Sequence, residues 1–272
     1  GLMPNPKTGT DDNNNWSNPL NWSATSGTST GTNTCIPSSG SVITIDAASF
    51  DGGSDIDITL DIDGIGESIT FATNDDNITF TGSTARKLII EGNVVLNSNT
   101  NFSSFTGTLE VTGDAVGVTH RINSGGADLS TVDLLVNNTI PTDSYELLTN
   151  GLSVDDFQLE SGVFSVNNEL LSVDRLDLDF TGDAVRSFDF DGQKVIVRGN
   201  GVTEVVDFQS TTGNLTLTLG DVLTAELEFI NSGQLVLELG ENALTIPNLD
   251  FQQATNIDAF TKTTSDNTVT MK

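Results

Sequence analysis

The sequence predicts an all-β protein built as a parallel β-helix, a solenoid expected to be right-handed. The motif FQSTTGNLTL, which begins at Phe208, recurs as FINSGQLVL at Phe229. The start of a third copy follows after a similar interval at Phe251. No window of comparable length has a helical period. A period near twenty with β-type alternation is typical of a solenoid in which one repeat makes one coil.

An antiparallel β-sandwich is the alternative fold, because it also contains many short strands. The repeat favours the solenoid, since it aligns by a whole coil rather than by pairs of strands. Asn-Gly is the strongest short signal for a two-residue hairpin, and it occurs only at Asn150 and Asn200. The sandwich therefore remains the less favoured fold.

Residues 1–40 differ from the rest and are expected to cap the solenoid, which then spans residues 41–272. This polar segment contains both tryptophans, Trp16 and Trp22. The first coil of a solenoid would otherwise expose its apolar interior, and terminal units are accordingly atypical. We expect the two rings to lie over that end. The alternative is an exposed aromatic platform for a sugar ring.

Short expected strands follow one another closely after residue 41. The clearest runs from Ile56 to Ile62, where apolar residues alternate with Asp or Thr. Side chains in a strand point alternately to opposite faces, so the apolar set is expected to point inward. The other expected strands in this region are rich in β-branched residues and bounded by Gly, Asn or Asp. They lie at 42–45, 68–71, 77–80 and 88–90.

The second half of the chain is organised by phenylalanines that follow an acidic residue. If one repeat makes one coil, these rings stack inside the solenoid at intervals of about 4.8 Å. Each stacked pair then adds about 0.5 to 1.5 kcal/mol beyond burial. The phenylalanines at which these repeats begin are Phe157, Phe180, Phe208, Phe229 and Phe251. The longest interval, from Phe180 to Phe208, is expected to contain a lengthened loop or an additional strand at 188–190.

The acidic residue before each of these phenylalanines is the candidate site of the chain. On the same reasoning, the five carboxylates face outward in one column. Two unit charges about 4.8 Å apart in water repel by about 0.9 kcal/mol, and a divalent cation would remove that repulsion. The column therefore predicts a Ca²⁺ site, and the alternative is a solvated acidic stripe. The candidate metal ligands are Asp156, Asp179, Asp207, Glu228 and Asp250. Two other acidic clusters, at 11–15 and 74–77, are expected to be turns.

The net charge of the protein limits the kinds of partner that it can bind. The charge is −28, from 38 acidic and 10 basic residues, and such a surface repels nucleic acid and anionic membranes. No apolar run reaches the roughly 18 residues that a membrane-spanning helix needs. The start of the chain lacks the pattern of a secretory signal, so we expect one to have been removed. A composition rich in Thr, Ser, Asn, Asp and Gly suits a secreted or cell-surface protein.

No combination of residues identifies a reaction, so an enzyme is the less favoured class. His120 is the only histidine, which argues against sites with several histidines and leaves a Ser-His-Asp triad without support. Cys35, the only cysteine, cannot form an internal disulfide and is expected to be inert and partly buried.

A polysaccharide lyase or a glycoside hydrolase on the same scaffold is the alternative function. A glycoside hydrolase needs only two carboxylates about 5 to 10 Å apart, which an acidic chain supplies by chance. A lyase would use basic residues and carboxylates that share one face. The basic candidates are Arg186, Lys194 and Arg198, and the acidic ones are Asp189 and Asp191.

Two segments resemble parts of large secreted surface proteins of the Bacteroidetes group. The order Trp16, Asn21-Trp22-Ser23, Pro37 and Gly40-Ser-Val42-Ile-Thr-Ile45 is similar to the opening that leads into their parallel β-helix. The segment from Arg186 to Gly192, followed by Val195-Ile-Val197 and Asn214-Leu-Thr-Leu217, resembles their coils.

The resemblance implies a surface β-helix of the adhesin type. The chain ends within a strand-like stretch, from Asn267 to Lys272, so we expect it to be an adhesive or stalk-like segment of a larger protein. A glycan or another cell-surface partner is expected to bind to its shallow side faces. Binding to ice or to a crystal through ranks of threonine, such as Thr216 and Thr218, is a third possibility.

Overall fold

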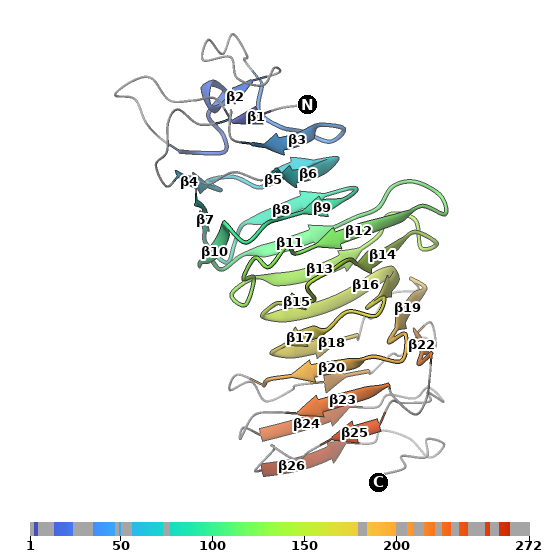
Figure 1. The fold of residues 1–272 in the computed structure, drawn as a ribbon. Helices are drawn as coiled ribbons and strands as arrows, with labels where there is room; N and C mark the ends of the chain where they lie inside the picture. Colours follow the sequence, from blue (N-terminus) through green and yellow to red (C-terminus); the bar gives the residue numbers. More distant parts are fainter. Residues whose placement is uncertain are drawn as a thin grey trace.

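Parallel strands stack on one another from the N-terminal to the C-terminal end of the molecule (Figure 1). In this computed structural model the described residues are 3–4, 14–23, 35–46, 49, 56–72, 77–178, 184–199, 206–208, 215–220, 225–229, 234–238, 248–250 and 256–261. Among the strands of these segments, the antiparallel exception is β1 (Met3–Pro4) with β2 (Trp22–Ser23). The predicted parallel β-helix is therefore confirmed, and the antiparallel sandwich is wrong.

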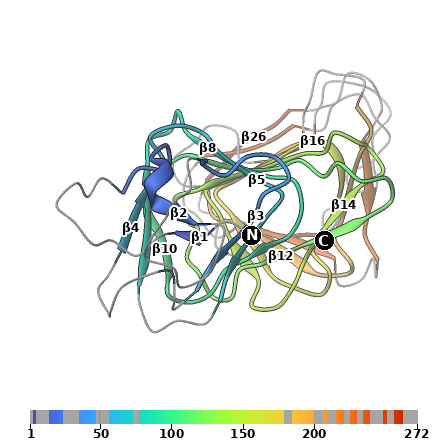
Figure 2. The ribbon, with the colours of Figure 1, turned by 90° about the horizontal axis from the view of Figure 1, so that it is seen from above.

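The chain visits three faces in a repeated order, which we call faces 1, 2 and 3. Seen along the axis, the coils enclose a common interior (Figure 2). Face 1 consists of β3 (Val42–Ile45), β6 (Ser68–Phe71), β9 (Val94–Val95), β12 (Thr119–Asn123), β14 (Ser144–Leu147), the second half of β16 (Asp156–Ser165), β19 (Arg186–Asp189) and β22 (Leu215–Thr218).

Face 2 follows face 1 along the chain and has two parts. It consists of β4 (Ile56–Thr59), β7 (Ile78–Gly82) and β10 (Thr100–Phe105), and then of β15 (Leu152–Ser153), β17 (Leu171–Val173), β20 (Lys194–Val197), β23 (Glu226–Phe229) and β25 (Asn248–Asp250). Isolated bridges from Asn101 to Asp128 and from Leu129 to Val154 connect the two parts.

Face 3 completes each coil. It consists of β5 (Gly64–Gly66), β8 (Lys87–Ile90), β11 (Thr108–Val111), β13 (Asp133–Asn137), the first half of β16, β18 (Arg175–Asp177), β21 (Val206–Asp207), β24 (Gln234–Glu238) and β26 (Asn256–Thr261). The long strand β16 passes from face 3 to face 1 without a loop, because its first half pairs with β13 and its second half with β14.

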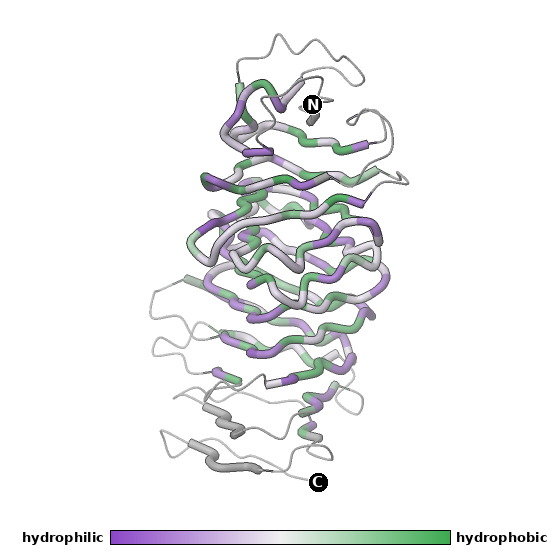
Figure 3. The backbone as a smooth tube through the Cα atoms, turned by 90° about the vertical axis from the view of Figure 1, so that its left-hand side faces the viewer, coloured by the Kyte–Doolittle hydropathy of each residue, from purple (hydrophilic) through white to green (hydrophobic). Residues whose placement is uncertain are grey.

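Apolar side chains point inward at every second position of a strand. In and directly after β4, Ile58 and Leu60 are buried, whereas Asp57 is exposed. Hydrophobic and hydrophilic stretches alternate along the tube in Figure 3. The predicted alternation is confirmed from Asp57 to Leu60, whereas Asp61 and Ile62 are both half-buried and β4 ends at Thr59 rather than at Ile62.

The coil length does not equal the spacing of the sequence repeat. On face 3, Val206 lies opposite Leu237, so the coil between them is longer than the interval from Phe208 to Phe229. Phe208 directly follows β21 on face 3, whereas Phe229 ends β23 on face 2. The prediction that these two rings occupy equivalent places in successive coils is therefore wrong. Phe180 and Phe251 lie outside the described residues.

Aromatic stacking occurs elsewhere, on the inner side of face 1. His120, Tyr145, Phe164 and Phe188 lie opposite one another in β12, β14, β16 and β19. The ring centroids of His120 and Tyr145 are 5.1 Å apart, and those of Phe164 and Phe188 are 5.7 Å apart. We call this set the aromatic ladder. Its last member lies in β19, which confirms the additional strand predicted within the longest interval.

Both tryptophans lie in the interior beside the first coil. Trp16 and Trp22 are 1% and 2% exposed, and their rings meet edge to face at 4.6 Å. The backbone N–H of Trp16 donates to the Thr59 carbonyl oxygen at 2.7 Å, and a Cβ placed on Gly64 would lie 3.0 Å from the Trp16 ring. A short 3₁₀ helix, η1 (Pro19–Asn21), separates them. The rings are placed as a lid requires, and the exposed sugar platform is wrong. The boundary at residue 40 stays a prediction.

Candidate functional site

The five predicted metal ligands do not form one column. Asp156 in β16 lies opposite Arg175, and Asp207 in β21 lies opposite Asp177, so these two carboxylates of face 3 are out of register. The other two described ligands belong to face 2, where Glu228 lies opposite Asp250. Asp179 lies outside the described residues. The single column is therefore wrong for the same reason as the phenylalanine repeat.

Glu228 is engaged by a lysine of the neighbouring coil. Lys194 Nζ lies 2.9 Å from Glu228 Oε2 and 3.0 Å from Glu226 Oε1. The hydrogen bonds to Glu228 and then to Glu226 raise the pKa of Lys194 above its ordinary value. A cation bound to Glu228 would have to compete with this ammonium group.

The corner between faces 2 and 3 gathers carboxylates from successive coils. Asp155, Asp174 and Arg198 follow strands β15, β17 and β20, whose register aligns the three residues. Arg198 Nε donates to Asp174 Oδ1 at 2.5 Å, and its two terminal nitrogens donate to Ser153 Oγ and to the Val154 carbonyl oxygen. One guanidinium thereby connects three consecutive coils. We call this group the Arg198 clamp.

Negative charge at this corner exceeds what the arginines neutralise. Burial, followed by the charges of Asp174 and Asp133, raises the pKa of Asp155. On the adjoining outer side of face 3, burial and then the charge of Asp133 raise the pKa of Asp156 to about 6. Arg175 lies closer to Asp177, at 2.8 Å, than to Asp156, at 3.9 Å. The predicted ligand Asp156 thus has a strongly perturbed carboxyl group.

A carboxyl group with a pKa of about 6 can hold or release a proton close to neutral pH, which is a property of catalytic acids. Structural ion-pair networks perturb carboxyl groups in the same way. Such a network is present here, since Arg198 pairs with Asp174 and Arg175 pairs with Asp177. Within the described segments, no group of three or more His, Cys, Asp or Glu side chains is arranged to hold a metal ion.

The basic residues proposed for a lyase do not share a face. Arg186 points into the interior with no exposed surface, and its Nη1 donates to the Leu178 carbonyl oxygen. Lys194 lies on face 2, and Arg198 lies at the corner described above. The lyase arrangement is therefore wrong, because a residue in β19 and a residue in β20 belong to different faces of the coil.

Face 1 presents two outward rows of side chains that cross five consecutive strands. The register of β12, β14, β16, β19 and β22 aligns both rows. The hydroxyl row contains Thr119, Ser144, Ser187 and Thr216, with Val163 at its centre. The charged row contains Arg121, Glu146, Ser165, Asp189 and Thr218. Of these rows the sequence indicated only Thr216 and Thr218, because the members are separated by coils of unequal length.

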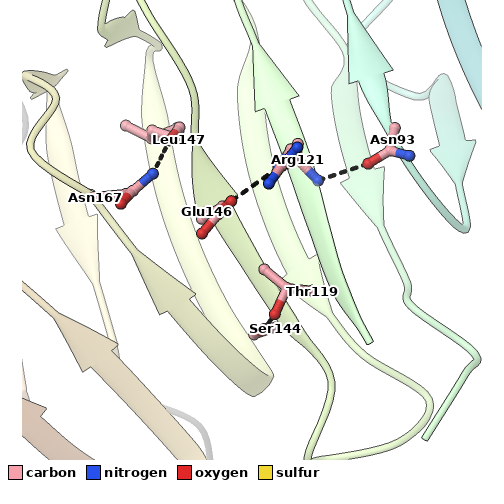
Figure 4. A network of polar contacts seen from close by, with 7 residues as sticks. All are labelled: Asn93, Thr119, Arg121, Ser144, Glu146, Leu147 and Asn167. Carbon is pink, nitrogen blue, oxygen red and sulfur yellow. Dashed lines mark hydrogen bonds and ion pairs between the residues drawn. The ribbon is translucent and has the colours of Figure 1, made fainter. Parts of the chain in front are cut away.

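Hydrogen bonds connect neighbouring strands of this surface (Figure 4). Arg121 Nε donates to Glu146 Oε1 at 2.9 Å, and the backbone N–H of Arg121 donates to Asn93 Oδ1 at 2.8 Å. Ser144 Oγ donates to Thr119 Oγ1 at 2.9 Å. Arg121 nevertheless keeps 58% of its side chain exposed, so donors remain available to a ligand.

The structure also locates most of the remaining candidates. His120 is 8% exposed and belongs to the aromatic ladder, which agrees with a structural role. Cys35 is exposed, so the expectation of a partly buried thiol is wrong. Most of the two acidic clusters, residues 11–13 and 74–76, lies outside the described residues.

Comparison with known proteins found no relative, so the function is inferred from the surfaces described above. No protein-family model, curated protein or solved structure matches the chain. Within the part of the chain that the structure describes, no helix is both long enough and apolar enough to cross a membrane.

Proposed function

We propose that this chain is a non-enzymatic segment of a larger secreted or cell-surface protein, similar in kind to the Bacteroidetes surface β-helices that its sequence resembles. In this proposal the solenoid is a rigid support, and face 1 binds a neutral glycan. A parallel solenoid suits this role, because each coil rests on the next and the stack forms an extended lateral surface.

The observation that supports the proposal is the pair of outward rows on face 1. Five strands spaced by about 4.8 Å give a polar strip about 19 Å long. Hydroxyl, guanidinium and carboxylate groups occur along the charged row, and these groups hydrogen-bond to sugar hydroxyls. Recognition would depend on hydrogen bonds, because both tryptophans and the only tyrosine, Tyr145, are buried. The net charge of −28 favours a neutral glycan over an acidic one.

A glycan-array screen tests this proposal. We expect the wild-type protein to bind neutral glycans, and Arg121→Ala to weaken that binding about tenfold, since a hydrogen bond from a charged group contributes about 1.5 kcal/mol or more. The matched control is Lys87→Ala on face 3, which also removes a half-exposed cation, one that lies 2.8 Å from Glu110. This control should bind like the wild type.

Two results would count against the proposal. One is a bound glycan whose affinity is unchanged in Arg121→Ala and in Ser144→Ala. The other is release of reducing sugar from the glycan that stops in Asp156→Asn. The second result would favour the alternative function, a glycoside hydrolase, to which the raised pKa of Asp156 points.

A further inference from the structure

Two buried oxygen atoms without hydrogen-bond partners lie at the corner between faces 3 and 1. They are Asn138 Oδ1 and Asp143 Oδ2. Asn138 is 3% exposed, and Asp143 has no exposed surface. Buried polar atoms are nearly always paired, so two such acceptors in one short turn require an explanation.

The orientation of the Asn138 amide is fixed by its surroundings. Its Nδ2 donates to the Asp143 carbonyl oxygen at 2.7 Å, and its backbone N–H donates to the Ser161 carbonyl oxygen at 3.2 Å. Gly162 packs so closely that a Cβ there would lie 2.2 Å from Nδ2. Rotating the amide would bring two oxygen acceptors together. Asn138 Oδ1 therefore faces the opposite side, toward Gly113.

Gly113 packs closely against these two side chains. A Cβ placed on Gly113 would lie 3.1 Å from Asn138 Oδ1 and 3.2 Å from Asp143 Cβ. The residue is buried and has a φ of +25°, so it is doubly suited to glycine. Asn138 Oδ1 and Asp143 are thus both close to the start of the loop that begins at Gly113.

Asp143 has too few partners for a carboxylate removed from water. Its Oδ1 accepts the backbone N–H of Gly117 at 2.9 Å. Its Oδ2 has no partner, and none of the ion pairs between described residues includes Asp143. A buried charge normally requires a counter-charge or a metal ion.

We propose that this corner binds a hard cation of the calcium class between Asp143 Oδ2 and Asn138 Oδ1. Carboxylate and side-chain amide oxygens are typical calcium ligands, and water completes the coordination in many sites. The exposed residue Asp114, next to Gly113, adds negative charge nearby. The cation would tie the 113–118 loop to the following coil and would compensate the buried carboxylate.

The position of the only tyrosine allows a direct test with terbium, a luminescent substitute for calcium. Tyr145 Oη accepts the backbone N–H of Gly113 at 3.3 Å, so its ring lies beside the proposed site. Tb³⁺ bound there should emit when tyrosine is excited, and excess Ca²⁺ should abolish the emission. We expect Asp143→Asn to weaken Tb³⁺ binding at least about tenfold, because it removes the charged ligand. Asp57→Asn, which removes one exposed carboxylate from face 2, should bind normally.

Thermal unfolding supplies a second readout. At a calcium concentration about 100 times its dissociation constant, we expect the Tm of the wild type to rise by about 5 °C relative to EDTA. Mg²⁺ and Na⁺ should raise it less, since calcium accepts the most irregular set of oxygen ligands. If Asp143→Asn does not fold, Asn138→Ala is the substitute, because it removes the other proposed ligand oxygen and should also remove the calcium effect.

Identical melting in EDTA and in Ca²⁺ would overturn the proposal. So would sensitised emission that survives both Asp143→Asn and Asn138→Ala, since the cation would then lie elsewhere. A buried water molecule, or a proton shared between Asp143 and Asn138, would give no emission and no calcium dependence. In the proton case, Asp143→Asn would be at least as stable as the wild type at pH 7, because the new amide could donate to Asn138 Oδ1.

Discussion

Replacing Phe164 with alanine is expected to lower the free energy of unfolding by about 3 to 5 kcal/mol. Phe164 has no exposed surface and occupies the middle of the aromatic ladder. Its ring lies 4.7 Å from that of Phe157 and 5.7 Å from that of Phe188. The neighbours are held by strands on both sides, so they cannot collapse into the cavity. Urea unfolding followed by circular dichroism measures the loss.

A double-mutant cycle makes this prediction specific to the ladder. Phe164→Ala and Phe188→Ala should be coupled by about 0.5 to 1.5 kcal/mol, the range for stacked rings. Phe80, which stacks on Phe102 at 4.8 Å in an earlier part of the solenoid, provides the control. Phe80→Ala and Phe188→Ala should be additive to within about 0.5 kcal/mol. A loss below about 1 kcal/mol for Phe164→Ala, or no coupling with Phe188, would contradict the ladder.

Replacing Arg198 with methionine is expected to destabilise the protein by about 3 kcal/mol at pH 7. Removal of one partner of a buried ion pair typically costs about 3 to 5 kcal/mol, and the lower end applies because the Arg198 side chain is 24% exposed. Methionine preserves the apolar stem and removes the charge. Asp174, with 8% of its side chain exposed, would be left buried beside Asp155 without its counter-ion.

The loss should depend on pH. Burial and neighbouring charge raise the pKa of Asp155, so its protonated form is favoured in the folded state. That contribution to stability is complete below the unfolded pKa and disappears as the pH rises through the folded pKa. Without Arg198 the repulsion at neutral pH is larger, so the destabilisation should be smaller at pH 4 than at pH 7.

Thermal melts of the wild type and of Arg198→Met at several pH values measure this difference. Arg121→Met serves as a control, because its exposed ion pair with Glu146 should contribute about 1 kcal/mol or less. A loss for Arg198→Met that is no larger than the loss for Arg121→Met, or that grows at low pH, would show that the Arg198 clamp does not compensate buried charge.

Fold class and strand positions could be predicted from the sequence because they depend on local patterns. The alternation from Asp57 to Leu60 and the turns rich in Gly, Asn and Asp require no knowledge of the neighbouring coil. Register could not be predicted. Strands of all three faces have the same alternation of apolar and polar residues. A motif from face 3 at Phe208 therefore matches one from face 2 at Phe229.

The candidate site was predictable only in part, for the same reason. The pKa of Asp156 is raised, which the sequence did not predict, because its charged neighbours Asp133 and Arg175 come from the preceding and the following coil. Asn138 gave no signal in the sequence, because its environment is formed by Gly113 and Gly162 from other coils. A glycine within a strand-like run, such as Gly162, often indicates close approach of another chain segment and was the only available clue.

Disulfide formation between engineered cysteines tests the register most directly. In a Cys35→Ser background, the structure places Ser187 and Thr216 opposite each other on face 1. Their Cα atoms should then be about 4.8 Å apart, within the range that a disulfide spans. Alignment of the two sequence motifs that begin at Phe208 and Phe229 instead pairs Thr216 with Val236, a residue that the structure assigns to face 3. We expect rapid cross-linking of the Ser187→Cys/Thr216→Cys protein and none of the Thr216→Cys/Val236→Cys protein. The reverse result would contradict the three-faced solenoid with coils of unequal length.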